Sequence, residues 1–98
     1  MKKLLIVLIL FFSYDAFSQT AKDYFERAYE KDENGDYYGA ISDYTKAIEL
    51  KPDYAEAYHN RSISKEEIGD LKGACDDAKK AVNLGNTSSQ KWLADNCN

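Results

Sequence analysis

The chain has 98 residues, of which 44% are hydrophobic and 31% charged, and its net charge is −4 at pH 7. This length leaves room for one small domain at most, because a compact domain usually needs about 100 to 200 residues. It is too short for a metabolic enzyme with a cofactor domain. A general nucleic-acid binder should be basic, so we expect a small acidic domain that does not bind nucleic acid.

The N-terminal segment up to Ser18 has the three parts of an export signal. Lys2 and Lys3 form a positive start, residues 4–12 are an unbroken apolar run, and small side chains at Ala16 and Ser18 precede Gln19. The apolar run is shorter than the roughly 20 residues of a membrane span, which makes a retained anchor the less favoured alternative. We predict a signal peptide over residues 1–18, export to the periplasm or secretion from a bacterial cell, and no stable membrane anchor after cleavage.

The rest of the chain contains an internal repeat. When residues 21–54 are aligned with residues 55–88, 13 of the 34 positions are identical. The identical pairs include Ala21/Ala55, Tyr24/Tyr58, Arg27/Arg61, Lys31/Lys65, Gly35/Gly69, Asp36/Asp70, Gly39/Gly73, Ala40/Ala74 and Ala47/Ala81. A repeat of this length is typical of stacked helix pairs, so we predict an all-α domain over residues 19–98.

Hydrophobic periodicity independently predicts a helix, a turn and a second helix in each repeat. In the first repeat, apolar residues recur at helical spacing over residues 21–29, stop at Asn34 and Gly35, and recur again over residues 37–48. Asp36 and its repeat mate precede the second helices, where an aspartate can accept hydrogen bonds from unpaired backbone amides. The run from Asp53 to Glu56 has the spacing of an acidic capping box.

Small and charged residues in the repeat predict how the helices pack. Alanines stand where the two helices of a pair must approach closely, and larger tyrosines fill the remaining gaps. The alanines are Ala28, Ala40, Ala47, Ala74 and Ala81, and the tyrosines are Tyr24, Tyr44 and Tyr58. Arg27 and Arg61 occupy the same repeat position, so we expect them to form packing contacts or ion pairs within a helix pair rather than to bind a ligand.

These residues resemble the motif of the tetratricopeptide repeat family. The matching residues of the first repeat are Tyr24, Gly35, Asp36, Tyr37, Ala40, Ile41, Tyr44, Ala47, Leu50 and Pro52. The second repeat departs from the motif at Ser62, Ala78 and Asn86, and Trp92, at the repeat position of Tyr58, begins a truncated third unit. The resemblance implies a tetratricopeptide-type helix-turn-helix solenoid with two full repeats, 21–54 and 55–88, and a C-terminal capping helix over residues 88–97.

Proteins of this family act as scaffolds, and the first helix of each pair lines a concave groove that holds a partner's peptide or helix. The resemblance therefore implies a groove surface formed by Lys22, Phe25, Tyr29, Asp32, Glu33, Glu56, His59, Asn60, Ile63, Glu66 and Glu67, with Gln90, Leu93 and Ala94 from the cap. Its acidic residues favour a basic or amphipathic partner segment. The alternative is that the charges only solvate the helices and the aromatic residues complete the core.

Self-association is a second possibility for the whole chain. Stable solenoids usually need about three repeats, and an exposed repeat end could stack on a second copy. The two readings are thus a protein-binding adaptor and a structural homo-oligomer with no separate ligand. Neither is an enzyme, and the family offers no precedent for a catalytic site.

The cysteines and the single histidine add one structural expectation. Cys75 and Cys97 are equally distant from the turn at residues 85–87, so they can face each other, and in an exported protein we favour a disulfide between them. The alternative is two separate thiols. His59 with two distant cysteines gives too few ligands for zinc. The acidic run at residues 32–36 lacks the glycine and glutamate of a calcium loop, so we predict no metal and no cofactor.

Overall fold

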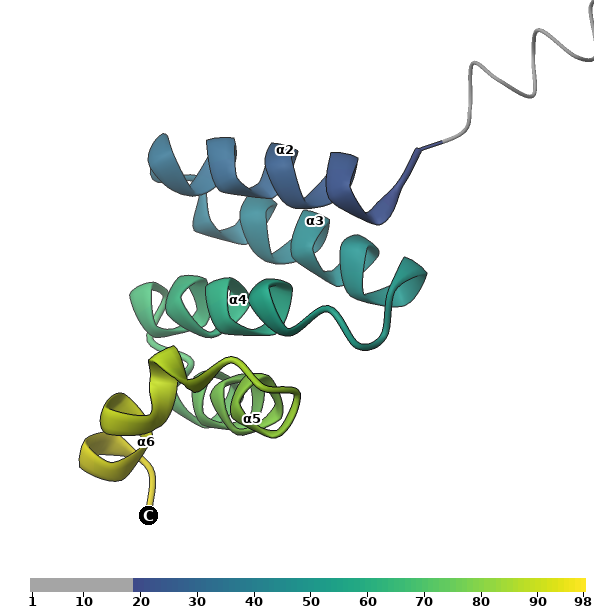
Figure 1. Ribbon diagram of the computed structural model, residues 1–98. Coiled ribbons are helices and arrows are strands. Elements are labelled where there is room, and N and C mark those ends of the chain that lie inside the picture. The colour runs from purple at the N-terminus through teal and green to yellow at the C-terminus, as the bar shows by residue number, and fades with distance from the viewer. Residues whose placement is uncertain (1–18) are drawn as a thin grey trace, which may run out of the picture.

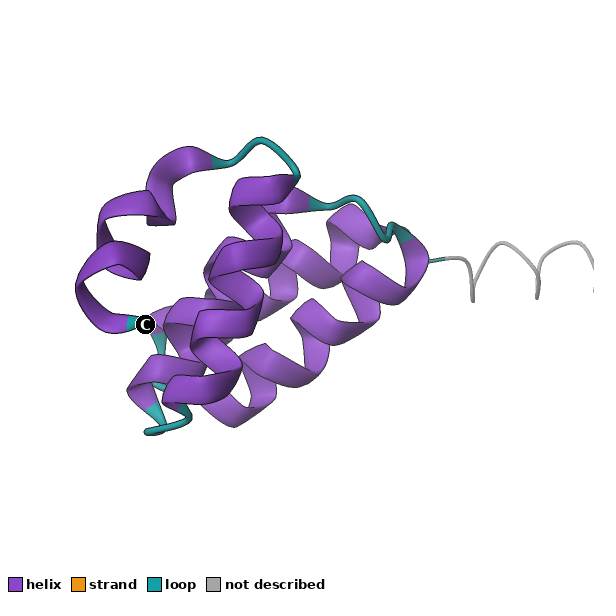
Figure 2. Cartoon of the chain, turned by 90° about the horizontal axis from the view of Figure 1, so that it is seen from below, coloured by secondary structure: helices purple, strands orange, loops and turns teal. Residues whose placement is uncertain are grey.

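The computed structural model describes residues 19–98, and the predicted signal peptide over residues 1–18 lies outside the described residues. Within residues 19–98 the chain is helical, without strands (Figure 2). The helices are α2 (Ala21–Glu33), α3 (Tyr37–Leu50), α4 (Ala55–Glu67), α5 (Leu71–Asn83) and α6 (Gln90–Asn96), with a 3₁₀ turn η1 (Thr87–Ser89) before α6. The predicted all-α fold is confirmed for residues 19–98.

The helices pack as two successive pairs followed by a single short helix. Helix α2 packs against α3, α4 packs against α5, and α3 packs against α4 to join the pairs. Figure 1 shows the resulting stack, with α2 at one end and α5, η1 and α6 at the other. This arrangement is the predicted helical solenoid.

Each pair turns between its two helices in the same way. Gly35 and Gly69 have φ angles of +80° and +85°, a left-handed conformation that residues with a Cβ rarely adopt. The next residue in each repeat is the predicted aspartate cap. The Asp36 carboxylate accepts a hydrogen bond from the Gly39 amide at 3.0 Å, and Asp70 accepts one from Gly73 at 2.9 Å. Both predicted caps are confirmed.

The core is built mainly from small side chains. The five alanines predicted to lie between closely packed helices are fully buried, as are Ala57 and Ala78. Tyr44 is the one large apolar side chain that is fully buried among the described residues. Tyr24 and Tyr58 are half-buried, and the guanidinium groups of Arg27 and Arg61 lie over their rings. Close helix approach therefore contributes more to this core than large side chains do.

A buried carboxylate holds each helix pair together on the side away from the groove described below. Arg27 donates two hydrogen bonds to Asp43, at 2.9 and 3.0 Å, and Arg61 donates two to Asp77, both at 2.7 Å. The hydrogen bond from Arg27 lowers the pKa of the Asp43 carboxyl, although burial of the carboxyl opposes that shift. The prediction that both arginines form ion pairs within a helix pair is confirmed.

The predicted capping box before α4 is wrong. Tyr54, not Asp53, is the N-cap residue of α4, and no side chain caps this end. The Tyr54 ring stacks on Phe25 with a centroid distance of 5.1 Å, and the Lys51 ammonium lies 4.6 Å from the Tyr54 ring centroid. Packing of the tyrosine ring thus determines how the chain enters α4, in place of a hydrogen bond from the aspartate.

The C-terminal segment begins with a 3₁₀ turn and continues as a helix shorter than the predicted one over residues 88–97. The Asn86 side chain accepts a hydrogen bond from the Ser88 amide, and α6 starts only at Gln90. Cys97 follows α6 and forms a disulfide with Cys75 of α5, with their Cα atoms 5.8 Å apart. The disulfide supports the predicted pairing and ties α6 to the second helix pair.

Candidate binding groove

Four hollows lie in a row along α2, α4 and α6. The N-terminal hollow, of about 340 Å³, is lined by Ala21, Lys22, Phe25, Glu26, Lys51, Tyr54 and Glu56. An open hollow of about 420 Å³ follows at Phe25, Glu26, Tyr29 and Glu30. The central hollow, of about 260 Å³, is lined by Tyr29, Asp32, Glu33, Tyr37, Tyr44, Asn60, Ile63 and Glu67. The C-terminal hollow, of about 170 Å³, is lined by His59, Ser62, Ile63, Glu66, Ser88, Ser89 and Trp92.

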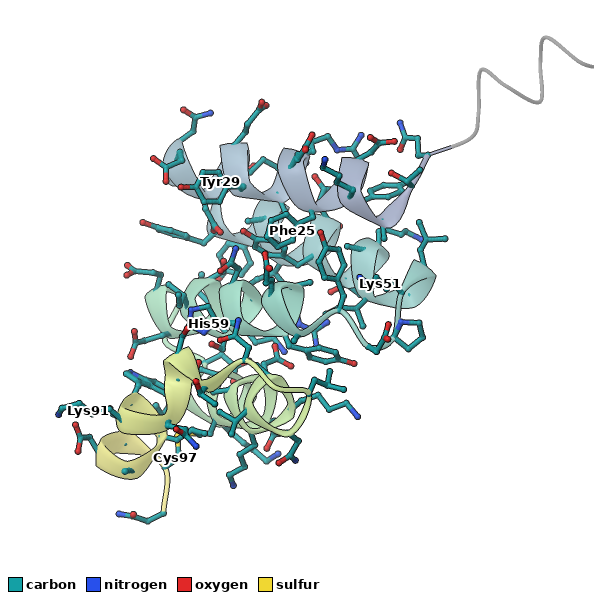
Figure 3. All side chains as sticks on the ribbon, viewed as in Figure 1. Phe25, Tyr29, Lys51, His59, Lys91 and Cys97 are labelled. Carbon is teal, nitrogen blue, oxygen red and sulfur yellow. A yellow bond between two sulfur atoms is a disulfide. The ribbon has the colours of Figure 1, made fainter. Side chains whose placement is uncertain are left out.

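Neighbouring hollows share lining residues, so they adjoin one another along one face of the stack, and we refer to them together as the groove. Phe25 belongs to the first two hollows, Tyr29 to the open and central hollows, and Ile63 to the central and C-terminal hollows. Figure 3 shows Phe25 and Tyr29 on α2, with His59 on α4 further along the stack. A chain segment laid in this groove would contact both helix pairs and the cap, which suits a peptide or helix better than a small molecule.

A hydrogen-bond network joins the two helix pairs beneath the central hollow. Asp32 of α2 accepts hydrogen bonds from the Tyr44 hydroxyl at 2.8 Å and from the Ser64 hydroxyl at 2.6 Å. Burial raises the pKa of the Tyr44 hydroxyl, and its hydrogen bond to Asp32 raises that pKa further, so Tyr44 stays a donor. Asp32 therefore connects α2, α3 and α4, and both of its carboxylate oxygens already have protein partners.

Aromatic stacking forms the floor of the N-terminal hollow. Besides stacking on Tyr54, Phe25 makes an edge-on contact with Tyr44 at a centroid distance of 5.5 Å. Phe25 packs against the buried core cluster and is only half exposed. It therefore serves both as a core side chain and as an apolar surface at this end of the groove.

Polar contacts link α4 to the cap at the C-terminal hollow. The His59 Nδ1 atom lies 2.6 Å from the Ser89 hydroxyl, and the Trp92 indole N–H donates to the Glu66 carboxylate. Burial lowers the pKa of His59, and the negative charge of Glu56 partly offsets that effect. The neutral imidazole is therefore the favoured form at neutral pH.

Every residue of the predicted groove surface lines this groove except the three from the cap, Gln90, Leu93 and Ala94, which line none of the four hollows. The N-terminal and open hollows are lined by the predicted residues Lys22, Phe25, Tyr29 and Glu56. The central hollow is lined by Tyr29, Asp32, Glu33, Asn60, Ile63 and Glu67. The C-terminal hollow is lined by His59, Ile63 and Glu66. Gln90 is exposed at the start of α6 and lines none of the four hollows. The role of these groove residues in binding a partner stays a prediction.

Several residues of the groove wall were not predicted from the sequence. They are Ala21, Glu26, Glu30, Tyr37, Tyr44, Lys51, Tyr54, Ser62, Ser88, Ser89 and Trp92. Tyr37 and Tyr44 come from α3, the second helix of a pair, which the family resemblance assigns to the other side of the stack. Trp92 was assigned only to the cap. Trp92 occupies the repeat position of Tyr58, which lines none of the four hollows, so the repeat pattern does not indicate that Trp92 lines the groove.

Over residues 19–98, no group of three or more histidine, cysteine, aspartate or glutamate side chains is arranged to hold a metal ion. None of the helices in that range combines the length and the apolar character that crossing a membrane would require.

One comparison with known proteins gives a match. Residues 33–64 match the family model described as "TPR repeat", which covers the end of α2, all of α3 and most of α4. The match supports a tetratricopeptide repeat protein, and the fold is a helical solenoid of that type. Repeats of this family generally mediate protein–protein interaction and are typically not enzymes. No curated protein matches the chain at a significant level of similarity.

Proposed function

We propose that the chain is an exported protein-interaction module that holds a peptide or helix of a partner protein in the groove along α2, α4 and α6. The row of adjoining hollows is the observation that carries this proposal. Tyr29 and Ile63 are 52% and 46% exposed although both are large and apolar. Exposed apolar side chains that line a groove are suited to anchoring a partner.

Acidic residues dominate the groove and favour a basic or amphipathic partner. The groove carries Glu26, Glu30, Asp32, Glu33, Glu56, Glu66 and Glu67, against Lys22 and Lys51. Complementary charge would steer a basic segment into the groove and help to select it. The proposal includes no catalytic residue and no cofactor.

The export part of the proposal rests on the signal pattern of residues 1–18. The disulfide is weakly compatible with it, because disulfides persist mainly in oxidising compartments outside the cytoplasm. We therefore place the protein in the periplasm or outside a bacterial cell, with residues 19–98 as the mature interaction domain.

Two features argue against one form of the homo-oligomer alternative, in which the α2 end of one copy stacks on the α5 end of another. First, η1 and α6 pack on α5 where a further helix pair would continue the stack, and the disulfide holds α6 there. Second, Arg61 donates a hydrogen bond to Thr45 of the preceding pair at 3.0 Å. In a continued stack, Arg27 of an added copy would meet Lys79, the repeat mate of Thr45, and two cations would face each other.

The experiment is a pull-down from envelope extract with the purified chain and two matched double variants. Tyr29→Ala with Ile63→Ala removes two groove side chains, whereas Tyr38→Ala with Leu71→Ala removes two exposed side chains of similar size outside the groove; Tyr38 is 73% and Leu71 50% exposed. We expect a partner that the wild type and the control retain and the groove variant loses. Equal retention by all three would contradict the proposal.

Sedimentation across a range of concentrations tests the homo-oligomer separately. Mass action makes self-association depend on protein concentration, so the proposal predicts an unchanged monomer mass. A mass that rises with concentration, together with recovery of only the chain itself in the pull-down, would favour the oligomer.

A further inference from the structure

We propose that the central hollow seats an arginine side chain of the partner segment, with Glu33 and Glu67 binding the guanidinium and Tyr29 stacking on it. This inference rests on the proposed function of the groove and names the side chain that the groove selects. The hollow has a volume of about 260 Å³, lies midway along the groove and combines aromatic walls with carboxylates from two helices.

Of the three carboxylates that line the central hollow, one accepts hydrogen bonds from other side chains of the protein and two do not. Both oxygens of Asp32 accept hydrogen bonds, from Tyr44 and Ser64. Glu33 ends α2 and Glu67 ends α4, and they occupy the same repeat position. Over residues 19–98 neither glutamate has an ion-pair or hydrogen-bond partner, so their negative charge at the hollow is uncompensated.

The lysines nearest in sequence do not neutralise these glutamates. The Lys31 ammonium lies 2.9 Å from Asp43, and the Lys65 ammonium lies 2.9 Å from Asp77. Both lysines are therefore held by the buried carboxylates within the helix pairs. The charge of the hollow is left to be complemented from outside, and a cation is the chemistry that does so.

The walls favour arginine over lysine. Tyr29 and Tyr37 line the hollow with accessible rings, and a planar guanidinium can stack on an aromatic face while its edge donates to carboxylates. Five N–H donors in a fixed fork can bind two separate carboxylates at once, whereas an ammonium acts as a point charge. Ile63 lies on the shared wall toward the C-terminal hollow, where it can contact the aliphatic part of the same side chain.

The experiment selects binders for the full purified chain from a random peptide library displayed on phage. We expect the selected peptides to share an arginine at one position. A synthetic copy of the best peptide is then compared with copies in which that arginine is replaced by lysine or by citrulline, a neutral side chain of nearly the same shape. Loss of charge-assisted contacts to two carboxylates should weaken binding about tenfold or more for citrulline, and less for lysine.

Matched variants assign the effect to the two glutamates. In Glu33→Gln with Glu67→Gln, we expect the preference for arginine over citrulline to fall to about threefold or less. The control, Glu49→Gln with Asp76→Asn, changes the net charge equally at exposed carboxylates of α3 and α5 that line none of the hollows, and should keep the preference. Circular dichroism checks that both variants fold.

The outcomes separate this inference from the proposed function. Peptides that bind the groove without a shared arginine, or that bind equally well with citrulline, would overturn the arginine site and leave the groove function standing. An unchanged preference in the glutamate variant would also overturn it. Failure to select any peptide that the Tyr29→Ala, Ile63→Ala variant loses would count against the proposed function itself.

Discussion

Asp43 and Asp77 occupy the same position in the two helix pairs, but their arginine partners differ in exposure. The Arg61 side chain is 14% exposed and also reaches Thr45 of the preceding pair, whereas the Arg27 side chain is 48% exposed. Removing one partner of a buried pair leaves an uncompensated charge, and water can solvate an exposed arginine far better than a buried one. The two sites therefore form an internal comparison at the scale of single residues.

We predict that Asp77→Ala lowers the free energy of unfolding by about 3 kcal/mol, and Asp43→Ala by about 1 kcal/mol. Urea unfolding of both variants, followed by circular dichroism, measures the two losses. Equal losses of unfolding free energy, or a larger loss for Asp43→Ala, would show that burial of the arginine does not determine how far each substitution destabilises the fold.

The lowered pKa of His59 predicts how the free energy of unfolding depends on pH. Because burial lowers the pKa of His59 below its ordinary value of 6.5, the unfolded chain binds a proton at a higher pH than the folded chain. The free energy of unfolding should therefore fall as the pH falls below the ordinary pKa of histidine. His59 is the only histidine in the chain, so His59→Gln should weaken this dependence between about pH 7.5 and about pH 5.5. An identical pH dependence in the variant would contradict the role given to His59.

At the scale of the helices, the start of α3 couples a glycine to its cap. An ideal Cβ at Gly39 would lie 2.2 Å from an Asp36 carboxylate oxygen, so an alanine there would displace the side chain that caps the helix. Alanine normally stabilises a helix by about 1 kcal/mol relative to glycine, and loss of an aspartate cap costs about the same.

Gly39→Ala should therefore have little net effect in the wild type but stabilise the Asp36→Ala variant by about 0.5 to 1 kcal/mol. A double-mutant cycle measured by thermal unfolding gives the coupling directly. The idea fails if Gly39→Ala stabilises both backgrounds to the same extent.

Most helix boundaries could be predicted because residues close to them in sequence determine them. The breaks at Gly35 and Gly69, the aspartate caps and the alanine spacing are all visible within a few residues of sequence. The start of α4 was not predictable in this way, because Tyr54 is held by a ring stack with Phe25, which lies in another helix. Local capping chemistry gave way there to a tertiary contact.

The groove was predictable only in part, for the same reason. The family resemblance placed most groove residues on the first helix of each pair, and it assigned Asp32 to the partner-binding surface without its internal hydrogen bonds. The hydrogen bonds of Asp32 come from residues 12 and 32 positions away in the chain. Contacts at such distances depend on how the pairs stack, which the periodicity of a single repeat does not determine. The repeat does align Glu33 with Glu67, although only the structure places both at one hollow.

At the scale of the whole molecule, the disulfide holds the cap on a short solenoid. It closes a loop between Cys75 and Cys97, which are 22 residues apart in sequence. Closing such a loop lowers the entropy of the unfolded chain, which raises the free energy of unfolding by about 3 kcal/mol. Helix α6 has only seven residues, too few for independent helical stability. Packing and the disulfide therefore keep it in place.

Cys75→Ser with Cys97→Ser should lower the free energy of unfolding by about 3 kcal/mol and increase amide hydrogen exchange first in α6. Because the central hollow is formed by α2, α3 and α4, partner selection should persist at temperatures where the variant stays folded. Faster exchange spread evenly over all helices would argue against a role confined to the cap.

The central claim is that the partner lies in the groove, and mapping of backbone amide chemical shifts by NMR tests it most directly. The isotope-labelled chain is titrated with the partner segment recovered in the pull-down. We predict shift changes concentrated at groove residues of α2 and α4, around Tyr29 and Ile63, and small changes at Tyr38 and Leu71 outside the groove. Shift changes concentrated on the exposed faces of α3 and α5, with the groove unaffected, would contradict the claim.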